Sequence, residues 1–160
     1  MTARASDGRV PGRRGQATRQ RLLECTLAML DTASYRDLKV VDIAREAGTS
    51  PATFYQYFTD VDAAIAELAG DMAADGATRL GGLLEGTRWS GEDAEASVRM
   101  LVTGFLDFWD ANRPLMRVID LKAAEGEGRI RSTRKDLLAG FSNGLAECVQ
   151  RKSLPDAPGN

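Results

Sequence analysis

The four residues Gly48-Thr49-Ser50-Pro51 impose the strongest constraint on how this 160-residue chain can fold. Glycine adopts the left-handed conformation that ends a helix, and serine followed by proline is typical of the cap and first turn of the next one. Apolar residues at three- and four-residue steps on both sides predict short helices over about 39–47 and 51–58. The sequence therefore predicts two helices joined by a tight turn, a helix-turn-helix.

The remainder of the chain shows helical periodicity and no sustained alternation of apolar and polar residues, so the predicted fold class is all-α. Further helices are expected over about 16–32, 61–84, 92–111, 114–124 and 130–150. We expect a disordered basic arm at 1–15, a helix-turn-helix domain at 16–62 and a helical regulatory domain at 63–160.

Positive charge is concentrated at the N-terminal end. Residues 1–21 carry six arginines and one aspartate, a net charge of +5, whereas residues 61–160 carry 12 basic and 16 acidic side chains, a net charge of −4. A basic end on an acidic body is the pattern expected when one end meets a polyanion, with Arg13 and Arg14 as candidate contacts. A solvated tail with no partner is the alternative for the first dozen residues.

The composition argues against an enzyme. The chain has no histidine, which is the usual general base and the commonest metal ligand, and it has no glycine loop of the kind that cradles phosphate. Asp107 and Asp110 share one face of a predicted helix, but the alternation with apolar residues there is that of an ordinary amphipathic helix. We expect no catalytic site, no cofactor and no metal.

Membrane insertion is not expected either, because no apolar run approaches the roughly 20 residues that cross a bilayer. Cys25 and Cys148 are far apart and suggest no disulfide framework. We interpret them as small hydrophobic residues in a reduced, cytoplasmic protein.

The predicted third helix carries the candidate functional surface. Its outer face offers short or neutral polar groups suited to the floor of a DNA major groove: Thr49, Ser50, Ala52, Thr53, Gln56 and Tyr57. Glutamine can pair with adenine and threonine can contact a base edge, while the hydroxyls of Tyr55 and Tyr57 suit phosphate oxygens. A plain helical hairpin is the alternative, but four aromatic residues within 53–58 are costly unless the outer side has a partner.

The run from Val41 to Phe58 resembles the DNA-binding signature of the TetR family of bacterial transcriptional regulators. The resemblance rests on Ile-Ala-x-x-Ala-Gly at 43–48 and Thr-Phe-Tyr-x-Tyr-Phe at 53–58, and it extends from about residue 18 to 65. It implies that Thr49, Pro51, Ala52 and Thr53 face bases and that Tyr55 and Tyr57 hold phosphates. Lys39 stands where relatives offer serine or threonine to phosphate. Asp62 stands where they usually carry lysine, so the basic arm is expected to compensate.

The resemblance also implies a cytoplasmic repressor that binds a pseudo-palindromic operator as a homodimer and responds to a small, largely apolar effector. Candidate pocket residues, for which ordinary core packing is the alternative, are Met100, Phe105, Phe108, Trp109, Met116, Leu121 and Phe141. Asp120 and Lys122 are expected as surface charges rather than ligand contacts. Relatives usually continue for two more helices, so a truncated regulatory domain or a differently built dimer is expected. A ligand-independent helix-turn-helix protein is the alternative function.

Overall fold

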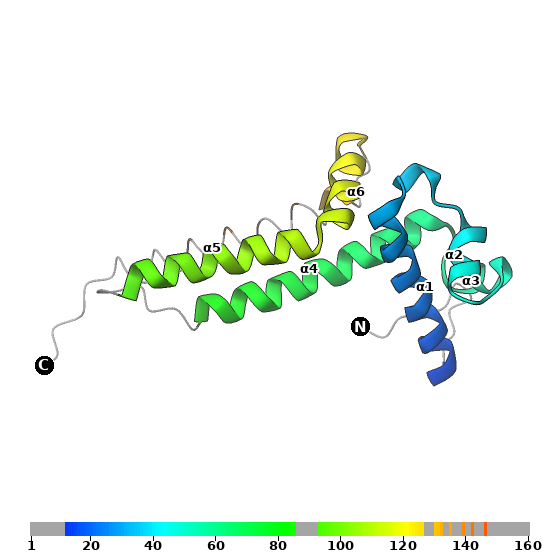
Figure 1. Ribbon diagram of the computed structural model, residues 1–160, viewed down its shortest axis with the longest axis horizontal. Helices are drawn as coiled ribbons and strands as arrows, with labels where there is room; N and C mark the ends of the chain where they lie inside the picture. The colour runs from blue at the N-terminus through cyan, green and yellow to red at the C-terminus, as the bar shows by residue number, and fades with distance from the viewer. Residues whose placement is uncertain are drawn as a thin grey trace, which may run out of the picture. The chain divides into compact units, whose positions relative to one another are not determined.

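The computed structural model describes residues 12–85 and 93–126, together with 130–132, 135, 139, 142 and 146. Within these residues the protein is helical and contains no strand, which confirms the predicted all-α class (Figure 1). The elements are α1 (Arg13–Thr32), the short 3-10 helix η1 (Tyr35–Asp37), α2 (Val40–Glu46), α3 (Pro51–Tyr57), α4 (Val61–Glu85), α5 (Asp93–Ala111) and α6 (Arg113–Ala124). Residues 1–11, most of the helix predicted at 130–150 and the C-terminal tail lie outside the described residues.

The chain forms two compact units. The first comprises residues up to Gly70 together with Pro114–Leu121, and the second comprises Asp71–Arg113 together with the chain from Lys122 onward. The helices α4 and α6 therefore each contribute to both units. Among the described residues, no helix is both long enough and apolar enough to span a membrane.

The first helix begins earlier than predicted. It starts at Arg13 rather than near residue 16, and the Gln16 amide donates to the Gly12 carbonyl over 2.9 Å. Arginine is a good helix former, and the one unfavourable residue in this turn, Gly15, does not interrupt the helix. Arg13 and Arg14 accordingly lie in the first turn of α1 and not in an irregular arm.

The core of the first unit is built where α1, α2 and α3 pack against one another. Leu22, Leu23, Thr26 and Leu30 form the buried face of α1. The Thr26 hydroxyl, which is completely buried, donates to the Leu22 carbonyl over 2.8 Å, so this polar group is satisfied inside the core. Ile43 and Ala44 of α2, which packs against α1, have no exposed surface.

The turn between α2 and α3 is a Schellman motif. The Thr49 amide donates to the Ala44 carbonyl over 2.8 Å, and the Gly48 amide donates to the Arg45 carbonyl over 3.0 Å. Gly48 adopts a φ of 66°, the left-handed conformation predicted for it. An added Cβ at Gly48 would meet no atom within 4 Å, so backbone conformation and not crowding is what favours glycine here.

Arg19 joins three elements of the first unit. Its guanidinium forms an ion pair with the Glu67 carboxylate of α4 and lies 5.2 Å from the centre of the Phe58 ring, which directly follows α3. The Arg19 side chain is only 11% exposed. The charge count in the sequence assigned this arginine to the basic end, but its cation is used inside the protein to hold α1 against α4.

In the second unit, α5 runs antiparallel to the later part of α4 (Figure 1). Gly104 marks a close approach, because an added Cβ there would lie 2.5 Å from Cδ1 of Leu83. Leu101 and Phe108 of α5 are buried, whereas Val98, Val102 and Leu106, spaced four residues apart, are each about half exposed. The helix therefore has one apolar face in the core and a second that meets solvent.

The expectation that Lys122 is a surface charge is wrong. It is 3% exposed, so it is not a solvated surface charge, whereas Asp120 is exposed. Leu115, Val118 and Ile119 precede it at seven, four and three residues, and all three are buried. Helical periodicity therefore places Lys122 on the buried face of α6.

Cys25 is partly buried in α1. Burial raises the pKa of its thiol, and the negative charge of Glu46 adds to that effect. A raised pKa keeps the thiol protonated near neutral pH, which agrees with the interpretation of Cys25 as a small hydrophobic residue. Cys148 lies outside the described residues.

Replacing Gly48 tests the turn. We expect Gly48→Ala to lower the free energy of unfolding by about 1–2 kcal/mol, because a side chain is strained at positive φ. Gly70→Ala is the matched control: it lies inside α4 with open space around an added Cβ, and we expect it to stabilise by about 0.5–1 kcal/mol. Denaturant unfolding measures both, and equal effects of the two variants would contradict the assignment.

Replacing Glu67 tests the ion pair with Arg19. We expect Glu67→Gln to cost about 1–2 kcal/mol, less than the loss of a fully buried partner, because the Glu67 side chain is 28% exposed. The control is Glu95→Gln, which removes the exposed pair between Glu95 and Arg99 at 3.0 Å and should cost less than about 0.5 kcal/mol. A Glu67→Gln variant as stable as the control would show that the pair does not hold α1 and α4 together.

Candidate nucleic-acid interface

The inner side of α3 is fixed by aromatic packing. Phe54 is fully buried and Phe58 is 3% exposed, with their ring centres 5.4 Å apart. Tyr55 packs edge-on against Phe54 with ring centres 5.9 Å apart, although 52% of its surface stays exposed. One side of this short helix is therefore anchored in the core, which leaves the other side in a defined orientation.

The start of α3 is capped as the sequence predicts. The Ser50 Oγ accepts a hydrogen bond from the Thr53 amide over 3.2 Å, and Pro51 occupies the first turn. The Ser50 and Thr53 hydroxyls also lie 3.0 Å apart and share a hydrogen bond. Whichever of the two donates, one hydroxyl proton remains to be offered outward. The two residues act as a coupled pair and not as independent contacts.

The outward side of α3 is small and largely uncharged. Ser50, Pro51, Ala52, Tyr55 and Gln56 are exposed, while Thr49, Thr53 and Tyr57 are half-buried. The surface therefore combines a hydroxyl pair, a methyl group, a carboxamide and a phenol on one short helix. Such groups can reach base edges and phosphate oxygens without the bulk of long side chains.

Three exposed cations belong to the same unit as this surface. Arg13, Arg14 and Lys39 are exposed, and none of them forms an ion pair with a carboxylate of the described residues. Lys39 is the N-cap residue of α2, and its side chain makes no capping hydrogen bond. Arg45 differs from these three, because its guanidinium lies 2.6 Å from the Asp42 carboxylate. The structure thus leaves the predicted phosphate-contact cations available to a polyanion.

Two acidic residues begin α4. The Asp60 carboxylate accepts a hydrogen bond from the Ala63 amide over 2.7 Å and so caps the start of the helix. Asp62 lies in the first turn and is half-buried. Carboxylates are favoured at a helix N-terminus because they oppose its positive dipole, and this gives a structural reason for acids in place of a lysine.

The predicted effector-pocket residues are divided between the two units. Phe108 is 5% exposed, and Phe105 and Trp109 are half-buried, with ring centres 6.2 Å apart in the second unit. Met100 of the same unit is 46% exposed. Met116, which is buried, and Leu121, which is 38% exposed, belong to the first unit. Phe141 lies outside the described residues.

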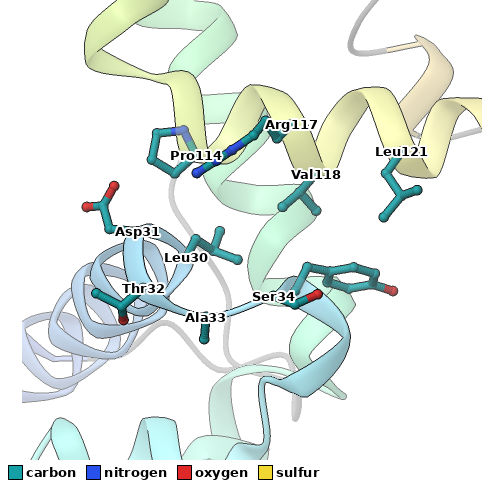
Figure 2. Close-up of a pocket in the computed structure, with 10 residues that line it drawn as sticks. Leu30, Asp31, Thr32, Ala33, Ser34, Pro114, Arg117, Val118 and Leu121 are labelled. Carbon is teal, nitrogen blue, oxygen red and sulfur yellow. The ribbon is translucent and has the colours of Figure 1, made fainter.

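A cavity of about 360 Å³ occurs in the first unit, and of these candidates only Leu121 lines it (Figure 2). This cavity could not be predicted from the sequence, because its wall combines two segments about 80 positions apart. They contribute Leu30, Asp31, Thr32, Ala33, Ser34 and Tyr35 on one side and Pro114, Arg117, Val118 and Leu121 on the other. The internal role of Arg19 was also missed. It could have been found, because Arg19 stands three and four residues before the buried Leu22 and Leu23.

Two family models match the chain. The model described as bacterial regulatory proteins, tetR family, matches residues 22–70, and the model described as the tetracyclin repressor-like C-terminal domain matches residues 80–155. This chain belongs to the TetR family. The first match contains α2, the Gly48 turn and α3, so the protein is a DNA-binding transcription regulator with a helix-turn-helix.

A solved structure agrees with the TetR fold. The chain is similar to a crystal structure described as a candidate tetR family transcription regulator from Shewanella sp. PV-4, with a TM-score of 0.58 and 19% sequence identity. The similarity covers 88% of this chain and 74% of that one. At this identity the comparison supports the arrangement of helices and carries no information about which DNA or ligand this protein binds.

Removing the Lys39 charge tests its predicted role. If the ammonium contacts a phosphate, Lys39→Gln should weaken binding similarly for all sequences and reduce the slope of log affinity against log salt by about one. Arg79→Gln is the control, because Arg79 pairs with Asp75 at 2.7 Å on α4 in the second unit. Fluorescence anisotropy over a salt series measures the slopes, and identical slopes for both variants would contradict the contact.

Proposed function

We propose that this TetR family regulator is a ligand-responsive repressor that binds a pseudo-palindromic operator as a homodimer. The observation that carries the proposal is the outer side of α3, where exposed Ala52, Tyr55 and Gln56 stand opposite a fully buried Phe54. In this proposal the base contacts come from Thr49, Pro51, Ala52, Thr53 and Gln56, with one hydroxyl from the Ser50–Thr53 pair. Tyr55, Tyr57, Lys39, Arg13 and Arg14 contact the backbone.

Dimerisation is proposed because the reading head, which we define as α2, the Gly48 turn and α3, is small. The seven residues of α3 span only about 10 Å along the helix axis, so one head covers a few base pairs. Two heads on successive half-sites about one helical turn apart would supply the specificity that a single head lacks. A cytoplasmic location is part of the proposal, because that is where a bacterial operator is found.

The effector would bind in the second unit. The half-buried pair of Phe105 and Trp109 beside the buried Phe108 offers aromatic surface to a small, largely apolar molecule. Binding would shift the population between conformations with different spacings of the two heads. The alternative is a ligand-independent helix-turn-helix protein, in which the same aromatic residues are only core packing.

Binding to the DNA upstream of the protein's own coding region tests the function. We expect that duplex to bind about a hundredfold or more tightly than a scrambled duplex, with a steep decrease in affinity as salt rises. Sedimentation of the complex should give two chains per duplex. Equal binding of both duplexes would contradict sequence-specific regulation, and one chain per duplex would contradict the dimer.

The effector is tested by screening small apolar compounds for release of the bound operator. A Trp109→Ala variant should keep operator affinity but lose the response to any active compound, while Met100→Ala, an exposed residue on the same helix, should behave similarly if it shares the pocket. A compound that releases DNA equally from wild type and both variants would place the effector site elsewhere. If no compound releases the operator DNA from the protein, the ligand-independent alternative is favoured.

A further inference from the structure

We propose that the cavity between the end of α1 and α6 in the first unit binds a small zwitterion with an apolar tail, of the chemical class of apolar α-amino acids. This site is separate from the proposed effector site in the second unit, and of the effector-pocket residues predicted from the sequence only Leu121 lines it. All ten residues that line it belong to the first unit. They come from the last turn of α1, the segment that leads into η1, the first residue of η1, and the first three turns of α6.

The size of the cavity limits the ligand. Its volume of about 360 Å³ lies near the lower end of the range for small-molecule sites, which begins at about 300 Å³. A drug-sized or polycyclic compound would not be enclosed, whereas a molecule the size of a single amino acid would be. The cavity also opens to solvent, so a charged head group can stay partly hydrated while a short tail is covered.

Charge decides which head group fits. Arg117 of α6 and Asp31 of α1 both line the cavity, and Figure 2 shows them on the side where Pro114 lies. Neither side chain takes part in an ion pair among the described residues. A carboxylate alone would be attracted by Arg117 and repelled by Asp31, and an amine alone would experience the reverse. A carboxylate and an ammonium on one small molecule complement both groups.

Part of the remaining wall suits a short apolar tail, beside the polar residues Thr32, Ser34 and Tyr35. Leu30 and Val118 lie between the charged side and Leu121 in Figure 2, and both are nearly fully buried, at 4% and 5% exposed. Leu121 is 38% exposed and has apolar surface left to cover. A branched or aromatic side chain on the zwitterion would reach these residues while its head group stays between Arg117 and Asp31.

Occupation would have a consequence for the protein. The head group would connect α1, which packs against the DNA-reading helices α2 and α3, with α6. The ligand would therefore stabilise the first unit by joining its α6 segment to α1, against which α2 and α3 pack. The ligand would not compete with DNA for this site, so its binding can be measured in the absence of DNA.

Titration calorimetry of the full chain with L-leucine and L-phenylalanine tests the proposal. We expect saturable binding of at least one of them with a dissociation constant of about 1 mM or below. N-acetyl-L-leucine lacks the ammonium and L-leucinamide lacks the carboxylate, and each should bind at least about tenfold more weakly than leucine. Arg117→Gln and Asp31→Asn should each weaken leucine binding by about tenfold or more.

Matched controls separate the site from general charge effects. Arg99→Gln and Asp75→Asn change exposed charges of the second unit and should leave amino-acid binding unchanged. Circular dichroism checks that every variant is folded, and Leu121→Trp, which fills the cavity from a partly exposed position, should abolish binding without charge removal. These readouts do not involve DNA, so a failure here leaves the operator-binding function unaffected.

Three results would overturn the proposal. The first is the absence of saturable binding of either amino acid. The second is binding that Arg117→Gln, Asp31→Asn and Leu121→Trp leave unchanged, because the amino acid would then occupy another site. The third is equal affinity for leucine and its N-acetyl or amide derivative, which would show that the two charges are not recognised together.

Discussion

The candidate DNA-binding surface depends on the backbone conformation of one residue. Gly48 at a φ of 66° allows the chain to leave α2 and enter α3 within a few residues, and the Schellman hydrogen bonds to Ala44 and Arg45 hold that turn. The turn directs Phe54 into the core, where the ring has no exposed surface. Because the inner side of α3 is fixed by Phe54 and Phe58, the outer side is fixed as well. The small residues there then become a surface of defined shape.

The basic residues of the first unit discussed above fall into two groups. Arg19 is committed to Glu67 and Phe58 and keeps α1 and α4 together. Arg13, Arg14 and Lys39 remain exposed, without an ion pair to any described carboxylate. The first kind of cation contributes to stability and the second remains available for phosphate. A net charge of −2 for the whole chain conceals this division, because it sets both groups of cations against the same 23 acidic side chains.

Local rules predicted the reading head well. The φ of Gly48 and the Ser50 cap depend on a few neighbouring residues, so both could be predicted from the sequence. Contacts between residues far apart in the chain could not be predicted from the sequence. The pair between Arg19 and Glu67 joins residues 48 positions apart, and the cavity joins Leu30 to Val118. Lys122 was mistaken for a surface charge because its residue type was weighed more heavily than its place on the helical period.

The central claim is that the outer side of α3 reads DNA bases, and selection of bound duplexes from a random pool tests it most directly. Wild type and Gln56→Ala are each taken through the same selection, with Gln20→Ala, an exposed glutamine on α1 that donates to Glu24, as the control. The account predicts an enriched motif of two symmetric half-sites, unchanged by Gln20→Ala and relaxed at one base pair of each half-site by Gln56→Ala. No enriched motif with wild type, or a motif that Gln56→Ala leaves intact while Gln20→Ala alters it, would contradict the account.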